Sequence, residues 1–169
     1  NMLNTDFPVL SQLFAQAELQ MSSISLALLA AAGLLMTGLL TGLWKYLAIA
    51  MSPHSRAPYY VDIAHRSSLM YAYSALLVAF LAALSPFSPT MTWWATAGPL
   101  FFFASAVVTY MIHGWLNDTR NQLAKPYVLG KSHLPGVLVH GFMGMLALVE
   151  IAGVAILAVG ACKTLWPLL

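Results

Sequence analysis

The five histidines are the side chains of this sequence best suited to chemistry: His54, His65, His113, His133 and His140. An imidazole binds metals and exchanges protons near neutral pH. Histidines without paired cysteines or several carboxylates suit haem iron, copper or zinc. The single cysteine, Cys162, excludes an intrachain disulfide and a multi-cysteine metal site. The question is therefore which histidine is placed to hold a metal.

His65 is the strongest candidate because it stands where a loop enters an apolar segment. It follows a short stretch that contains Tyr59, Tyr60 and Asp62, and it directly precedes Arg66. From residue 67 to residue 117 the chain contains no Asp, Glu, Lys or Arg, as expected of segments that lie in lipid. We predict that His65 holds a metal centre, in the first place haem iron, at the cytoplasmic end of a membrane bundle.

Further polar side chains gather in the apolar part of the chain. Tyr110, His113 and Asn117 are spaced to form one stripe on a helix, and His140 belongs to a later helix. Glu150 is expected deep in the membrane, where it must be neutral, paired or facing a polar cavity. Each histidine also has a plain alternative, a hydrogen bond between helices with no further role.

The composition is that of a single membrane domain over residues 1–169. Of the 169 residues, 60% are hydrophobic and only 7% are charged, against about 25% charged residues in a soluble domain. The net charge of +2 is too small to indicate a nucleic-acid partner. Residues 1–20 contain no Lys or Arg, so we expect no cleavable secretory signal.

Hydropathy divides the chain into four predicted spans. The expected fold class is all-α, an integral membrane four-helix up-down bundle in a lipid bilayer. Gly38 and Gly42 have the GxxxG spacing that lets helix backbones approach closely, so their face is expected to pack on another helix, within or between subunits. An N-terminal interfacial segment over residues 1–22 is expected to precede spans at about residues 23–51, 65–84, 93–116 and 134–161.

The basic residues predict how the bundle lies in the membrane. Six of the seven Lys and Arg residues flank or occupy the loops after the first and third spans, and only Lys163 lies on the other side. The positive-inside rule therefore places these two loops in the cytoplasm and both termini in the periplasm of a bacterial inner membrane.

Three short motifs resemble styrene oxide isomerase, a family of small four-helix bacterial membrane enzymes. Gly42-Leu43-Trp44 ends the first span, Ala64-His65 opens the second, and Tyr110 lies in the third at the family's separation from that histidine. The resemblance implies a homotrimer with haem b between neighbouring subunits, bound through His65. It implies that ferric iron acts as a Lewis acid on an aryl epoxide such as styrene oxide. The ring opens, a hydride shifts within the substrate, and an aldehyde results.

Carried over to this chain, the resemblance implies roles for particular residues. His65 would be the axial metal ligand and Tyr110 would orient the substrate. We also expect Arg66, Trp44 and His113 to bind the cofactor, although His113 has no counterpart in the family. The family has an active-site asparagine six positions after the histidine. Here that position is Tyr71, which can also hydrogen-bond an oxygen but fills more of the pocket.

Two other functions remain open from the residues. The first is a b-type cytochrome for electron transfer, in which His65 and either His113 or His140 fill both axial positions of the haem. The second is a membrane subunit without catalytic activity, whose histidines only form hydrogen bonds. The surplus of histidines favours the cytochrome, and the single-histidine resemblance favours the isomerase.

Overall fold

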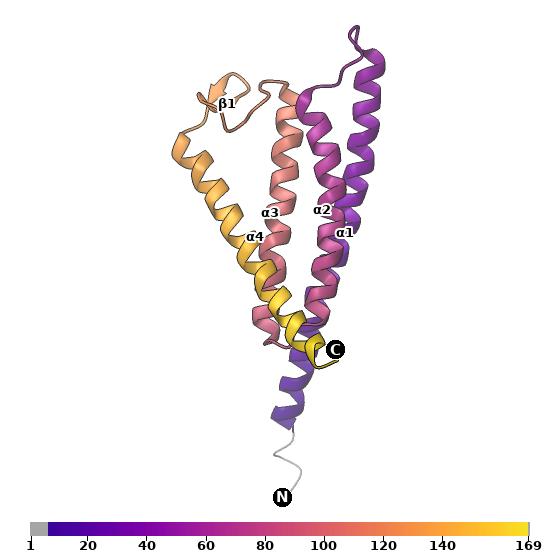
Figure 1. Cartoon of the computed structure of the whole chain (residues 1–169), viewed down its shortest axis with the longest axis vertical. Helices are drawn as coiled ribbons and strands as arrows, with labels where there is room; N and C mark the ends of the chain where they lie inside the picture. The colour runs from indigo at the N-terminus through magenta and orange to yellow at the C-terminus, as the bar shows by residue number, and fades with distance from the viewer. Residues whose placement is uncertain (1–6, 169) are drawn as a thin grey trace, which may run out of the picture.

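Four long helices lying side by side make up the bundle in the computed structural model (Figure 1). The structure describes residues 7–168, with side-chain surroundings from residue 11 onward. The elements are α1 (Phe7–Met51), α2 (Tyr59–Ala83), α3 (Pro89–Leu116), the strands β1 (Val128–Leu129) and β2 (Ser132–His133), α4 (Gly136–Leu165) and a final 3₁₀ turn (Trp166–Leu168). All four α-helices are long and apolar enough to cross a membrane. The predicted all-α membrane bundle is confirmed.

Helix α1 is longer than the predicted first span. It runs unbroken from Phe7 to Met51, 45 residues or about 68 Å at 1.5 Å per residue. The helix continues through the stretch predicted as a separate interfacial segment because strong helix formers such as Ala15, Glu18 and Met21 occupy it. Residues 1–6 of that predicted segment lie outside the described part of the chain. The first turns of α1 extend past the ends of the other helices (Figure 1).

Helix α2 begins at Tyr59, six residues before the predicted start at His65. Pro58 precedes its first turn, where the absence of a backbone N–H does little harm, and Asp62 in that turn interacts favourably with the helix dipole. The charges of Asp62 and Arg66 lowered the local hydropathy and concealed the start of the helix. His65 therefore lies in the second turn, inside the helix rather than at its entrance.

The other two helices also differ slightly from their predicted bounds. Helix α3 starts at Pro89, where the Ser88 side chain accepts a hydrogen bond of 3.3 Å from the Met91 N–H. It ends at Leu116, as predicted, because Asn117 takes a left-handed φ of 46°. Helix α4 begins at Gly136 and extends four residues past its predicted end at residue 161. The short hairpin before it was not predicted.

Small residues allow the helices to pack closely. A Cβ on Gly153 of α4 would lie 2.7 Å from the Ala95 carbonyl oxygen and 2.6 Å from Pro99 Cγ on α3. On α2, Ala75 and Ala82 are fully buried in the core. Close van der Waals packing of this kind is what joins helices in lipid, where the surroundings are as apolar as the side chains.

Helix α4 is held mainly by its second half. Helices α1, α2 and α3 pack against one another, whereas α4 contacts α3 and, more sparsely, α2. The buried residues of α4 all lie in that half: Gly153, Leu157, Gly160 and Ala161. Its first half diverges toward the end of the bundle that holds the loops 52–58 and 117–135 (Figure 1). We call this the basic end, since six of the seven Lys and Arg residues lie there: Lys45, Arg56, Arg66, Arg120, Lys125 and Lys131.

Candidate metal centre and the α3–α4 cleft

His65 faces α1, and one of its ring nitrogens is held by that helix. Its Nδ1 lies 2.7 Å from the Gly38 carbonyl oxygen, 27 residues away in sequence. A carbonyl oxygen only accepts hydrogen bonds, so Nδ1 carries the proton and donates it. In the neutral ring, Nε2 then keeps its lone pair. An imidazole whose Nδ1–H is bonded to a carbonyl has the tautomer and fixed orientation typical of a metal ligand.

Gly42 allows the His65 ring to lie this close to α1. A Cβ at position 42 would lie 2.8 Å from His65 Cε1 and 2.9 Å from Nδ1, closer than such atoms approach in proteins. One turn earlier, a Cβ on Gly38 would lie 2.6 Å from a side-chain methyl of Leu69. The GxxxG face therefore packs on another helix as predicted, and that helix is α2 of the same chain.

Arg66 belongs to an ion-pair network on the surface of α2. Its guanidinium lies 2.9 Å from the Asp62 carboxylate, which also pairs with Lys45 on α1. The Arg66 side chain is 65% exposed. The network joins the last turns of α1 to the first turns of α2, directly next to His65.

Trp44 lies on the side of α1 that faces α3. Its ring meets Trp115 edge to face at 6.5 Å between centroids. Within one chain no described contact joins Trp44 to His65, although both were predicted to bind the cofactor.

Tyr71 and Tyr110 lie between α2, α3 and α4. Tyr71 stacks on Phe103 with ring centroids 4.5 Å apart, and Tyr110 stacks on Tyr60 at 5.9 Å. Glu150 of α4 is close enough to act electrostatically on both Tyr71 and Tyr110. Its Oε1 is buried and has no hydrogen-bond partner among the described residues. Two hydroxyls and one carboxyl thus converge in an apolar interior.

The tyrosines and His65 occupy different faces of α2. Tyr60 and Tyr71 are eleven residues apart and share one side of the helix, whereas His65 lies about 120–140° around the axis from them at 3.6 residues per turn. His65 accordingly contacts α1, and the tyrosines contact α3. Within one chain the structure does not bring the predicted ligand and the predicted catalytic hydroxyls into contact.

A cleft between α3 and the diverging half of α4 contains Tyr110 and His113 of the predicted stripe, whereas Asn117 lies outside it, because the chain turns away at this left-handed cap. Its volume is about 950 Å³. Tyr110, Thr109 and His113 contribute polar groups to a lining that is otherwise mostly apolar, with Phe102 and Phe142 among the aromatic side chains. The cleft can accept a molecule with an aromatic body and few polar groups.

His113 is fixed by the loop after α3. Its Nδ1 donates to the Asp118 carboxylate at 2.9 Å, and both side chains are only 4% exposed. The second carboxylate oxygen accepts the Gly130 N–H at 2.6 Å. Burial alone would raise the pKa of the Asp118 carboxyl, but the hydrogen bonds from Gly130 and His113 outweigh it and hold that pKa below its usual value. His113 therefore has a structural partner that the sequence did not reveal.

The remaining histidines serve the loops. His140 Nε2 lies 2.8 Å from the Tyr127 hydroxyl, a contact that joins α4 to the loop before it. His54 and His133 are exposed in loop 52–58 and in the hairpin. Of the five histidines, His65 alone has a ring nitrogen bonded to a backbone carbonyl of another long helix in the described part of the chain.

The sequence missed the groups that orient these histidines. The Gly38 carbonyl holds His65 from 27 residues away, and Asp118 holds His113 from the loop five residues further on. The Tyr60 ring packs on His113, and its hydroxyl accepts the Gln122 N–H at 2.7 Å. No periodicity in the sequence marks them. Across residues 7–168, no three His, Cys, Asp or Glu side chains converge as a metal-ion site would require.

Comparisons with protein-family models, curated proteins and solved structures give no match to this chain. Any function must therefore be argued from the residues and their geometry.

Proposed function

We propose that this protein is a haem b-dependent membrane isomerase that converts an aryl epoxide, such as styrene oxide, to an aldehyde. The observation that carries the proposal is the hydrogen bond from His65 Nδ1 to the Gly38 carbonyl, because it orients the ring and leaves Nε2 as the nitrogen with an available lone pair. The motifs around Gly42, His65 and Tyr110 support it through their resemblance to styrene oxide isomerases.

The residues around His65 fit a single-histidine haem ligand. The Nδ1–H to carbonyl bond increases the basicity of the imidazole, and the absence of a side chain at Gly42 keeps the ring in place. Haem requires only one protein ligand when its sixth position is to stay open, so a lone imidazole is sufficient. When bound, the haem would supply an electron-poor iron that polarises the epoxide oxygen.

The chain itself would supply orientation and a dry environment. Tyr110 lies in mostly apolar surroundings, where its hydroxyl can hydrogen-bond the substrate oxygen more strongly than in water. Tyr71 brings a second hydroxyl to the same interior. Phe102 and Phe142 offer aromatic surface to an aryl ring and exclude water that would otherwise open the epoxide.

The separation of His65 from the tyrosines supports a site shared between subunits. His65 and Tyr110 contact different helices of one chain, so a substrate held near one His65 would meet the tyrosines of a neighbouring copy. We therefore propose the homotrimer that the resemblance implies as the active form.

A bis-histidine cytochrome is less well supported. His113 has the free Nε2 that an axial ligand needs, but its ring packs on Tyr60 at 5.2 Å, on the face of α2 turned away from His65. His140 has its Nε2 engaged by Tyr127. A haem held by two histidines of one chain would have to displace these contacts.

Replacing His65 tests the ligand. We expect purified His65→Ala protein to lose its Soret band, whereas His54→Ala, with an exposed loop histidine replaced, should keep it. Both variants should elute as folded oligomers in detergent. A full Soret band in His65→Ala would rule out His65 as the essential ligand.

Turnover separates the isomerase from the cytochrome. The ferric protein should form aldehyde from styrene oxide without any reductant, and dithionite should slow it, since ferrous iron polarises an oxygen less. Tyr110→Phe should keep the haem spectrum and lose about 10²–10³ in rate, the usual cost of one positioned hydrogen-bond donor. Tyr73→Phe, on an exposed position of α2, is the matched control. If ferric protein with a full complement of haem forms no aldehyde from several epoxides, the isomerase proposal fails and the cytochrome becomes the better-supported function.

A further inference from the structure

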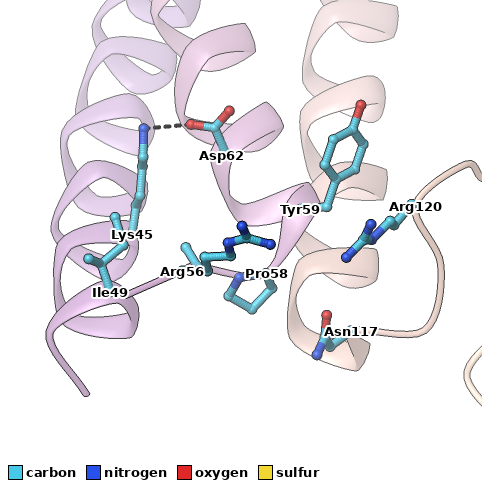
Figure 2. Close-up of a pocket in the computed structure, with 9 residues that line it drawn as sticks. Lys45, Ile49, Arg56, Pro58, Tyr59, Asp62, Asn117 and Arg120 are labelled. Atoms are coloured by element: carbon cyan, nitrogen blue, oxygen red, sulfur yellow. Dashed lines mark ion pairs between the residues drawn. The ribbon is translucent and has the colours of Figure 1, made fainter. Parts of the chain in front are cut away.

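A second hollow lies at the basic end, between the end of α1, the start of α2 and the loop after α3 (Figure 2). Its volume is about 560 Å³. It is separate from the α3–α4 cleft and shares no lining residue with it. We call it the basic pocket; its lining residues are Lys45, Ile49, Arg56, Ala57, Pro58, Tyr59, Asp62, Asn117 and Arg120.

The basic pocket has an excess of positive charge. Asp62 is the only acidic group in its lining, and Lys45 and Arg66 already pair with it. Arg56 and Arg120 have no ion-pair partner among the residues that the structure describes. Figure 2 shows both guanidinium groups turned toward the same space, from two loops that are more than sixty residues apart. Two unpaired cations held around one hollow repel each other unless an anion lies between them.

The donors of the basic pocket suit a phosphate group. A guanidinium presents N–H groups in a planar fork that matches two phosphate oxygens. The Asn117 side-chain amide adds an uncharged donor, on a residue whose backbone N–H caps α3 by bonding to the His113 carbonyl at 2.8 Å. Arginines on two separate loops can therefore grip one phosphate from two sides.

The place of the pocket in the bundle indicates where that phosphate would come from. It lies where α1 ends and α2 begins, at the level of a lipid headgroup if these helices span the membrane. Large apolar side chains are exposed in the last turns of α1, among them Tyr46, Leu47 and Met51, so acyl chains can contact this end of the helix. Pockets rich in Lys and Arg at the ends of spans bind anionic lipid headgroups. Soluble phosphate offers the same oxyanion without the chains.

We propose that the basic pocket is a phosphate-binding site formed by Arg56, Arg120 and Asn117, distinct from the proposed haem site and independent of it. The site takes a phosphate group with uncompensated negative charge. An anionic phospholipid and inorganic phosphate both present this group, and they can be distinguished experimentally.

The test uses the full-length protein in detergent, with Arg56→Gln/Arg120→Gln as the variant. The control is Lys125→Gln/Lys131→Gln, which removes the same charge from exposed residues at the same end but outside the pocket. Three probes are added in turn: phosphatidylglycerol, phosphatidylcholine and inorganic phosphate. The apparent Kd is measured from the rise in melting temperature and, for the lipids, from adducts in native mass spectra.

We expect phosphatidylglycerol to bind the wild type and the lysine control equally, and the arginine variant about tenfold or more weakly, because charge-assisted hydrogen bonds are lost. Phosphatidylcholine should bind all three proteins weakly, since its choline cancels the phosphate charge. If inorganic phosphate, added without lipid, raises the melting temperature of the wild type but not of the arginine variant, the site takes soluble phosphate. If phosphatidylglycerol produces this difference and inorganic phosphate does not, the site takes the lipid headgroup.

Two outcomes overturn the proposal. One is that the wild type and the arginine variant bind phosphatidylglycerol with the same affinity, and also bind phosphate with the same affinity. The other is loss of haem from the arginine variant, which would assign these charges to the carboxylates of the cofactor. Should the double variant not fold, Arg56→Lys and Arg120→Lys keep the charge but lose the fork and should show the same order of affinities.

Discussion

At the scale of single residues, one hydrogen bond decides what His65 can bind. With Nδ1–H bonded to Gly38, only Nε2 can act as a ligand, and the ring cannot rotate to exchange the two. The glycine at position 42 is part of the same arrangement, because any larger residue would meet the ring. The first residue of the Gly-Leu-Trp motif, Gly42, thus has a physical role, which is to leave room for the His65 ring.

Gly42→Ala tests this arrangement without touching the ligand itself. The added methyl would lie 2.8 Å from His65 Cε1, so the ring must move and its bond to Gly38 should weaken. We expect a shifted Soret band and faster loss of haem to apomyoglobin, with the bundle still folded. Gly33→Ala is the matched control on α1, because nothing lies within 4 Å of a Cβ there. Equal haem loss from both variants would contradict the role given to Gly42.

The sequence singled out His65 as a candidate ligand, which stays a prediction, but it could not show what surrounds the ring. Its position beside a long charge-free segment is visible in the chain, whereas its partner is a carbonyl 27 residues away. His113 shows the same limit. The sequence placed it on a stripe with Tyr110, which the cleft bears out, but could not show that Asp118 folds back onto its ring. Contacts that depend on how a loop turns leave no periodic signal.

At the scale of elements, the loop 117–135 is tied to three helices. Asp118 holds it to α3 through His113, Tyr60 holds it to α2 through the Gln122 N–H, and His140 holds it to α4 through Tyr127. These contacts cover the basic end of the α3–α4 cleft, where α4 has few buried residues of its own. The loop therefore sets how far α4 diverges.

Asp118→Asn should loosen this loop. We expect a loss of about 1–3 kcal/mol, because two hydrogen bonds to a buried carboxylate are weakened. The pKa of Asp118 is lower in the folded protein than its unfolded value of about 3.9. The carboxylate therefore stabilises the fold fully above about pH 4, and this contribution is lost as the pH falls through the folded pKa.

The measurement is the melting temperature in detergent at pH 7 and from pH 5 downward. Asp118→Asn should melt lower than wild type at pH 7, and the difference should shrink at the acid end. Glu18→Gln removes an exposed carboxyl on α1 and should melt like wild type throughout. A difference between wild type and Asp118→Asn that stays constant with pH would contradict a role for the ionised carboxylate.

Helix existence was predictable from the sequence, and helix starts were not. Four apolar stretches gave four helices because hydropathy over some twenty residues depends on no tertiary contact. The starts were misplaced wherever polar residues enter a helix, as at Tyr59, where Asp62 is satisfied by Lys45 of the neighbouring helix. The hairpin escaped prediction because its strands contain two residues each and Gly130, with φ +61°, was the only turn signal.

At the scale of the whole molecule, the two ends of the bundle differ in packing and in charge. At the end where α4 terminates, Gly153 and Gly160 bring it close to Ala95, Pro86 and Phe87. At the basic end α4 separates from α3, loop 117–135 lines the cleft between them, and six of the seven Lys and Arg residues lie there. Both proposed binding regions thus lie toward the end that is least tightly packed.

The same asymmetry predicts how the bundle is oriented. Four spans place both chain ends on one side of the membrane, and the loops 52–58 and 117–135 on the other. Lys and Arg near the ends of spans are retained in the cytoplasm, and here six of seven lie at the basic end. A reporter fused after Leu169 should therefore read as periplasmic, and one inserted beside Lys125 as cytoplasmic.

Charge reversal provides the control, since orientation should follow the cations and not the helices. Moving Lys to the opposite end, by Lys125→Gln and Lys131→Gln together with added Lys beyond Leu169, should produce molecules of mixed orientation. If the unaltered chain gives a cytoplasmic signal after Leu169, the bases do not set the orientation. The basic pocket would then face the periplasm, and its phosphate would have to come from the outer leaflet.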